Sequence, residues 1–179
     1  MARRFERIAR AEGDPELESL YTDIMESGFG DGVPLNWFTS QGARPDILAA
    51  TWKLVKAVLL QGQLPATIKH MIIVNVATLS QCRYCATVHT NALEAMGVPI
   101  EIMDGLTTDL NLSKVPPPQR AILEFAAKVA RQPKSVTDGD FEQLRELGLS
   151  EGETMEVAMM GAFANFINTW ADVSGIPID

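Results

Sequence analysis

The sequence predicts an all-α protein, and three observations support that prediction. Helix start and stop signals recur along the chain, apolar residues repeat at helical spacing, and no segment alternates apolar and polar residues as a half-buried strand does. The 179 residues, 46% of them hydrophobic, are enough for one core. We therefore expect one helical domain over 1–179: an N-terminal arm and first helix in 1–45, the helices carrying the cysteines in 46–112, and a second helical hairpin in 113–179.

Prolines mark the starts of the first three helices. The dipeptide Asp14–Pro15 is typical of an N-cap residue followed by proline at the first helical position. Two further prolines, Pro45 and Pro65, open the next two helices in the same way. The expected ranges are 15–26, 45–60 and 65–79. The apolar face of the second helix is expected to comprise Ile47, Leu48, Trp52, Val55 and Leu59.

The next helix contains both cysteines of the chain. Ser80 is its expected N-cap and Gly97 its expected end, with a short helix over 99–106 beyond. The segment 115–118 contains three consecutive prolines, which no helix interior tolerates. We expect it to be a hinge inside the domain, followed by a helix over 119–131.

Two capping boxes predict the remaining helices. Thr137–Asp140 and Ser150–Glu153 each place a hydroxyl three residues before a carboxylate, and the second opens the longest helix, to about Asp172. This helix is apolar over a wide arc, as expected of a helix buried on several sides. The expected stripe is Met155, Ala158, Met159, Ala162, Phe163, Phe166, Ile167 and Trp170, and Val157 and Met160 lie off its centre. We therefore expect a homo-oligomer that covers this second side.

Charge and hydropathy exclude several classes of protein. The net charge of −8 leaves no basic surface for phosphates, which argues against a nucleic-acid-binding protein. The basic N-terminus lacks the apolar stretch of a signal peptide. No apolar run approaches the roughly 20 residues of a membrane-spanning helix. These observations predict a cytoplasmic protein that does not bind membranes.

A C-x-x-C motif is the strongest candidate site. In a helix, Cys82 and Cys85 lie roughly 5–6 Å apart at their β-carbons, and His89 lies one turn after Cys85. The surrounding residues 47–93 contain no Asp or Glu. Positive charge favours a thiolate, and this segment has four basic residues, Lys53, Lys56, Lys69 and Arg83. The alternative explanation is that 47–93 is simply core, which excludes carboxylates.

Four chemistries compete for the motif. A thioredoxin-like site follows a strand, but 64–79 is predicted to be helical, and a c-type haem needs a histidine where Ala86 stands. A zinc site remains open, because Cys82, Cys85, His89 and His70 supply four ligands. A thiol redox site also remains open, since it needs only the two cysteines and a base.

At this point the sequence resembles a known family. The block from Leu64 to Gly97, with the pattern C-x-x-C-x-x-x-H at a helix start, resembles the alkylhydroperoxidase D-like / carboxymuconolactone decarboxylase family. The segment from Arg120 to Asn168 is similar to its peroxidase-related branch. The resemblance implies an all-helical, oligomeric thiol peroxidase without metal or organic cofactor, built as trimers or hexamers.

The resemblance also implies roles for individual residues. Cys85 would attack a hydroperoxide, Cys82 would resolve the sulfenic acid to a disulfide, and His89 would belong to a proton relay. A dithiol or a disulfide reductase would donate the electrons. Attack by Cys85 implies that its thiol has the lower pKa, although Cys82 lies closer to the helix N-terminus, which favours the opposite order.

Two positions depart from the family pattern. His70 stands where a glutamate usually feeds protons to the site, and Tyr84 lies between the cysteines, where histidine is common. We expect both to be auxiliary members of the relay, with a buried structural role for His70 as the alternative. Two other functions remain open: a zinc-binding helical module and a non-catalytic oligomeric scaffold.

Overall fold

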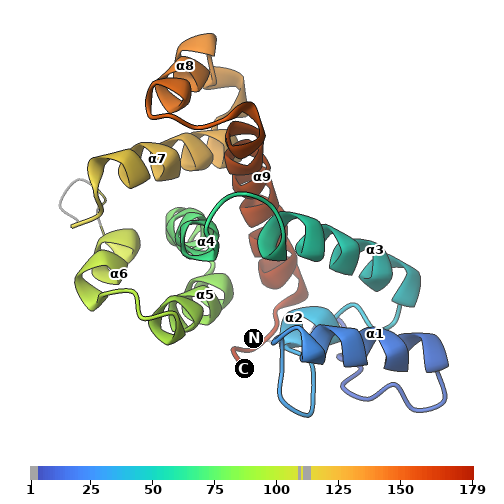
Figure 1. Cartoon of the computed structure of the whole chain (residues 1–179). Helices are drawn as coiled ribbons and strands as arrows, with labels where there is room; N and C mark the ends of the chain where they lie inside the picture. Colours follow the sequence, from blue (N-terminus) through green and yellow to red (C-terminus); the bar gives the residue numbers. More distant parts are fainter. Residues whose placement is uncertain (1–3, 109, 111–113) are drawn as a thin grey trace.

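The computed structural model describes residues 4–108, 110 and 114–179, and this part of the chain is helical (Figure 1). It has no strand in these residues beyond an isolated bridge between Gly30 and Pro34. The elements are α1 Pro15–Glu26, α2 Asn36–Thr39, α3 Pro45–Val55, the π-helix η1 Lys56–Leu60, α4 Ala66–Ser80, α5 Arg83–Ala95, α6 Ile100–Thr107, α7 Pro117–Arg131, the 3₁₀ turn η2 Pro133–Ser135, α8 Asp138–Glu146 and α9 Glu151–Ser174. The all-α prediction is confirmed.

Helix α4 lies at the centre of the molecule (Figure 1). It packs against α5, α6, α7 and α9, and every residue from Ile68 to Ala77 is buried. A helix that is apolar on all sides is expected in such a position. The buried side chains around it form one cluster with contributions from α1 through α9.

The predicted capping signals are confirmed at three helix starts. The Asp14 carboxylate accepts hydrogen bonds from two amides of the first turn of α1. Reciprocal capping boxes open α8, at Thr137 and Asp140, and α9, at Ser150 and Glu153. These contacts satisfy amides that have no partner within the helix, which is why the sequence signal is reliable.

One expected helix boundary is wrong. The second helix does run from Pro45 to Leu60 as expected, although its last turn, η1, is π-helical. Ser80 does not cap the cysteine-bearing helix: it is the last residue of α4, and its hydroxyl donates to the carbonyl of Val76. Cys82 is the N-cap residue of α5 instead.

Helix α9 turns a different face inward from the one expected. Met155, Met159 and Phe166 of the predicted stripe are 62%, 45% and 42% exposed, whereas Val157 and Met160 are fully buried. The apolar arc is so wide that periodicity alone does not predict which of its residues face the core. Gly161 determines this, because a β-carbon there would lie 2.4 Å from the carbonyl oxygen of Ala126 in α7. That close approach fixes the rotation of α9.

The segment after α9 returns to the N-terminal helices. The Asp179 carboxylate accepts a hydrogen bond from the Asn36 amide at 2.7 Å, and the Asn36 side chain donates to the carbonyl of Pro177. These bonds hold the residues after α9 against α2, close to the start of α5. None of the described helices combines the length and apolarity that a bilayer-crossing segment needs.

Candidate active site

A left-handed residue sets the position of the motif. Gln81 has φ 60° and ψ 26°, and it is the sole non-glycine residue with positive φ in the described part of the chain. This conformation ends α4 and redirects the backbone, so that Cys82 caps α5 and Cys85 lies in its first turn. Unusual backbone conformations often occur at functional sites, and this one directly precedes the cysteine pair.

The two cysteines are free thiols, and their side chains are linked by a hydrogen bond. Cys82 is fully buried and Cys85 is 2% exposed. The hydrogen bond from Cys85 lowers the pKa of the Cys82 thiol, and the same bond together with burial raises the pKa of Cys85. The direction of this bond favours the Cys82 thiolate, whereas the resemblance implies the lower pKa for Cys85.

A carboxylate lies beside the cysteine pair, although 47–93 contains none. The Cys82 thiol contacts the carbonyl of Asn168 at 3.7 Å, and Asp172 follows one helical turn later in α9. The Asp172 carboxylate raises the pKa of both thiols through its charge. The inference of a carboxylate-free surrounding is therefore wrong. No signal in the sequence links Asp172 to a motif ninety residues earlier, since only the packing of α5 on α9 brings them together.

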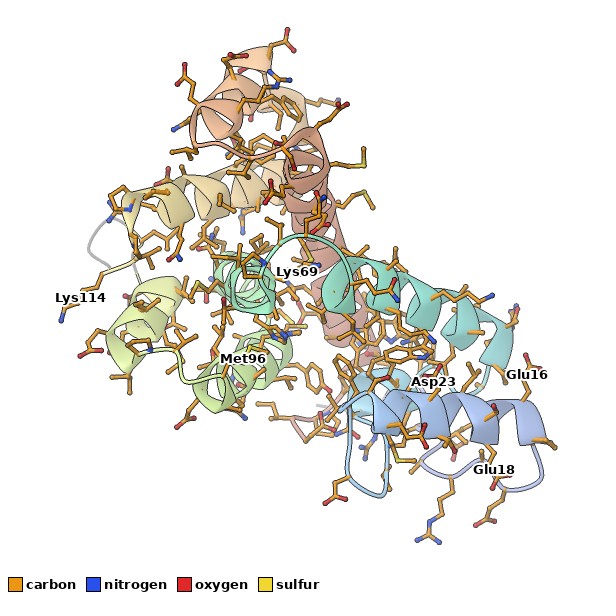
Figure 2. All side chains as sticks on the ribbon, viewed as in Figure 1. Glu16, Glu18, Asp23, Lys69, Met96 and Lys114 are labelled. Atoms are coloured by element: carbon orange, nitrogen blue, oxygen red, sulfur yellow. The ribbon has the colours of Figure 1, made fainter. Side chains whose placement is uncertain are left out.

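The basic residues near the motif also differ from expectation. Lys56 pairs with Asp23 at 2.7 Å, and buried Lys69 pairs with Glu156 at 3.5 Å. Figure 2 shows Lys69 in the middle of the molecule and Asp23 between α1 and α3. The charges of Lys56 and Lys69 are neutralised by these carboxylates, and the two lysine side chains contribute to the packing of the helices. Arg83, by contrast, is exposed next to the cysteines.

His70 and His89 form a buried pair. Their Nδ1 atoms lie 2.9 Å apart, with ring centroids 4.9 Å apart, across the α4–α5 interface. One Nδ1 must donate and the other accept, so the two rings share one proton along this line. Burial lowers the pKa of His70 to about 4, and burial together with the neighbouring His70 lowers that of His89 to about 3. Both rings are neutral at pH 7 and can pass a proton between them.

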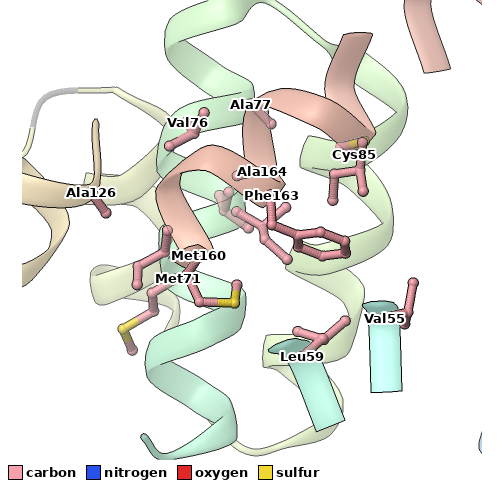
Figure 3. Packing of buried hydrophobic residues seen from close by; sticks show 14 of the residues in the cluster. Val55, Leu59, Met71, Val76, Ala77, Cys85, Ala126, Met160, Phe163 and Ala164 are labelled. Carbon is pink, nitrogen blue, oxygen red and sulfur yellow. The ribbon is translucent and has the colours of Figure 1, made fainter. Parts of the chain in front are cut away.

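An apolar cavity of about 40 Å³, the inner cavity, connects Cys85 with His89. Its wall is formed largely by side chains from α2, α3, η1, α5 and α9. Figure 3 shows Phe163 of α9 pointing toward the space between Cys85, Leu59 and Val55. Leu59 belongs to the π-helical turn, and such turns frequently occur at functional sites. The cavity has room for a few atoms beside the Cys85 sulfur.

Tyr84 lies in the wall of both this cavity and a larger one. It lines both the inner cavity and a cleft of about 780 Å³, the outer cleft, which is bordered by Arg7, Arg83, Asp172 and the segment after α9. Its hydroxyl donates to Asp179 at 2.5 Å and accepts from the Trp37 amide at 3.2 Å. Burial, followed by the Asp179 bond, raises the pKa of Tyr84. The hydroxyl is therefore engaged by the segment after α9.

The zinc alternative gains no support from the geometry. Within 4–108, 110 and 114–179, no group of three or more His, Cys, Asp or Glu side chains is placed to bind a metal ion. The two histidine Nδ1 atoms face each other, and the two thiols are hydrogen-bonded to each other. The four candidate ligands thus form two separate pairs.

A comparison with protein families matches residues 45–108 to the carboxymuconolactone decarboxylase family. The matched segment spans α3 to α6 and contains both pairs. A comparison with curated protein sequences gives no match.

Solved structures share the whole fold. One is an alkylhydroperoxidase AhpD core, a peroxidase-related protein from Ralstonia eutropha JMP134, with 26% identity and a TM-score of 0.88 over 99% of this chain and 92% of that one. A peroxidase-related protein from Silicibacter sp. TM1040 has 23% identity and a TM-score of 0.81 over 93% and 88%. The debrominase Bmp8, an alanine variant in complex with 2,3,4-tribromopyrrole, has 22% identity and a TM-score of 0.83 over 100% and 93%.

Proposed function

We propose that this chain, which resembles the carboxymuconolactone decarboxylase family over residues 45–108, is a thiol-dependent peroxidase that reduces hydroperoxides through Cys85 and Cys82. One observation supports this most: one sulfur of a hydrogen-bonded dithiol lies in the wall of a small apolar cavity, which a buried histidine also lines. The cavity favours a small peroxide that can approach Cys85 without displacing much bound water.

The hydrogen bond between the thiols supplies the first proton transfer. When Cys82 is the thiolate, it takes the Cys85 proton, and the Cys85 thiolate so formed attacks one peroxide oxygen. The O–O bond breaks, Cys85 becomes a sulfenic acid, and the leaving alkoxide takes up a proton. Cys82 then displaces water from Cys85 and closes a disulfide. A dithiol or disulfide-reductase donor restores both thiols by exchange.

Thiol titration with mass spectrometry tests the proposal. One equivalent of hydroperoxide should remove both free thiols and two hydrogens from each chain, and excess dithiol should restore them. Cys85→Ser should abolish peroxide consumption, whereas Cys82→Ser should stop at a sulfenic acid that dimedone traps. Oxidation that yields only intermolecular dimers would show that the proposal is wrong.

His89 provides a second test of the same site. Replacing it with alanine removes a general base from the cavity wall and should lower kcat/KM for hydroperoxide about 10²–10⁴-fold. Helical circular dichroism of the same sample checks that the variant is folded. An unchanged rate in folded protein would remove His89 from the mechanism.

A further inference from the structure

We propose that Tyr84 is a gate residue that controls which molecules reach Cys85, and that the Asp179 carboxylate holds this gate closed. The inference rests on the proposed function and deepens it, because it names the element that admits hydroperoxide and electron donor to the dithiol. It involves the segment 175–179 after α9, outside the segment 45–108 that the family model matches.

The dithiol is closed off from solvent in this structure. Cys82 and Cys85 are 0% and 2% exposed, and the inner cavity beside Cys85 has a volume of about 40 Å³. Reduction of a disulfide, however, requires that a donor thiolate attacks one of its sulfurs directly. The attack forms a mixed disulfide and releases one cysteine, and the donor's second thiol then closes the donor's own disulfide and releases the other. A cavity with room for a few atoms does not admit a dithiol, so the site must open for this step.

Tyr84 lies where an opening would connect the dithiol with solvent. Among the described residues, it is the one that lines both the inner cavity and the outer cleft. It directly precedes Cys85 in the first turn of α5 and is 6% exposed. The outer cleft, with a volume of about 780 Å³, has room for the ring of Tyr84 when it turns away from the inner cavity. This rotation would join the two spaces beside Cys85.

The Asp179 carboxylate ties Tyr84 to α2, which contributes to the wall of the inner cavity. One carboxylate oxygen accepts a hydrogen bond from the Tyr84 hydroxyl at 2.5 Å, and the other accepts one from the Asn36 amide at 2.7 Å. Trp37, which lines the inner cavity, donates its amide to the same hydroxyl at 3.2 Å. The carboxylate thus bridges α5 and α2 and fixes the position of the Tyr84 ring.

The segment that carries this carboxylate is held mainly at the surface. Residues 177–179 are exposed, and 175–176 are half-buried. A further hydrogen bond, from the Asn36 side chain to the Pro177 carbonyl at 3.2 Å, joins the segment to α2. Segments with few buried contacts open at a low cost in free energy, and hydrogen bonds to a charged group are among the stronger ones. The bonds of Asp179 are therefore well placed to control the opening.

Alkylation of Cys85 tests the gate, because reagent size separates access from thiol acidity. Rates are measured with iodoacetamide and with the bulky fluorescein maleimide, in a Cys82→Ser background where Cys85 is the one remaining cysteine. Both reagents react with the same thiolate, so the ratio of their rate constants does not depend on the fraction ionised. Asp179→Ala removes the carboxylate from an exposed position. The matched control is Asp104→Ala, which removes an equal charge from an exposed position in α6.

A latch at Asp179 predicts that Asp179→Ala raises the maleimide rate by about tenfold and the iodoacetamide rate by less, so that the ratio rises. Tyr84→Phe, which keeps the ring and removes the hydroxyl, should raise the ratio as well. Combining the two changes should add little, because they break the same bond. An unchanged ratio in both single variants, or an equal rise in Asp104→Ala, would overturn the proposal.

The same experiment separates the gate from the peroxidase function, because alkylation needs no peroxide. A rise in the ratio in protein that does not consume hydroperoxide would reject the peroxidase function and keep the gate. Consumption of hydroperoxide with an unchanged ratio would keep the peroxidase function and overturn the gate.

Discussion

At the scale of single residues, the site is built from two pairs that share protons. His70 and His89 share one through their Nδ1 atoms, and Cys82 and Cys85 share one through their sulfurs. Burial is the common cause, because it disfavours charge on each group and makes the internal partner the available one. Each pair is thus poised for proton transfer between its two members.

The histidine pair makes stability depend on pH. Below about pH 6.5 the unfolded chain binds protons on both histidines, whereas the folded chain resists them down to about pH 4 for His70 and 3 for His89. The free energy of unfolding should therefore be constant above about pH 7 and fall as the pH drops from about 6.5 toward 4. We expect a loss on the order of 1–2 kcal/mol per histidine by about pH 5.

Urea unfolding at a series of pH values measures this loss. The double variant His70→Gln with His89→Gln should lack the decline between about pH 6.5 and 5. Carboxylates such as Asp140, whose pKa the bond from Lys128 lowers to about 2, lose their contribution only at lower pH. Equal slopes for the double variant and the parent protein in that window would contradict the prediction.

Gln81 offers a test of backbone strain next to Cys82. A left-handed conformation costs roughly 1–2 kcal/mol for a residue with a β-carbon, and glycine avoids this cost. Gln81→Gly should raise the free energy of unfolding by about 1 kcal/mol, and β-branched Gln81→Val should lower it. Chemical denaturation gives both values. A destabilised glycine variant would show that the exposed Gln81 side chain makes a contribution of its own.

At the scale of elements, a buried ion pair joins the start of α4 to α9. Lys69 is 1% exposed, and its ammonium lies 3.5 Å from Glu156 and donates to the carbonyl of Gln61. The Glu156 carboxylate also accepts from the amides of Gln63 and Leu64 at 2.6 and 2.9 Å. One side chain of α9 therefore fixes the loop between η1 and α4, and with it the π-helical turn that places Leu59 in the cavity.

Removing this carboxylate should be costly. Glu156→Ala leaves Lys69 charged, buried and unpaired, so we expect a loss of about 3–5 kcal/mol in the free energy of unfolding. The matched control is Asp46→Ala, which breaks the exposed Arg44–Asp46 pair and should cost at most about 1 kcal/mol. Guanidinium denaturation compares them. Similar losses in both variants would mean that the Lys69 ammonium reaches water after the change.

At the scale of the whole molecule, α9 leaves an apolar stripe exposed. The stripe follows a heptad-like spacing of four and three residues, as in a helix that packs lengthwise on another. Its apolar members are Met155, Met159, Ala162, Phe166 and Val173. The stripe is the surface that the proposed homo-oligomer would cover, and the adjacent face of the same helix carries Asp172.

Light scattering tests the oligomer. The parent protein should give a mass of a trimer or hexamer at low micromolar concentration, and Met159→Glu with Phe166→Glu should reduce it toward the chain mass of 19.6 kDa. Ile47→Glu, at an exposed apolar position in α3, is the control that should leave the mass unchanged. A parent protein that stays near 19.6 kDa is a monomer, and the oligomer would be ruled out.

The sequence determined much of this protein by local physics. The caps of α1, α8 and α9, the prolines, and the spacing of Cys82, Cys85 and His89 act over one or two helical turns, so they can be read directly from the chain. Local signals of this kind predicted an all-helical protein with a thiol pair at a helix start. The sequence predicted an auxiliary role for His70, but it did not predict that His70 would contact His89.

Only the tertiary structure decided what depends on contacts between distant helices. Asp172 lies near Cys82 because α9 packs on α5, and its charge raises the pKa of both thiols. The rotation of α9 follows from the close approach of Gly161 to α7, which periodicity over a wide apolar arc does not specify. Electrostatic and steric effects of this kind act through space over a few ångströms, whatever the separation along the chain.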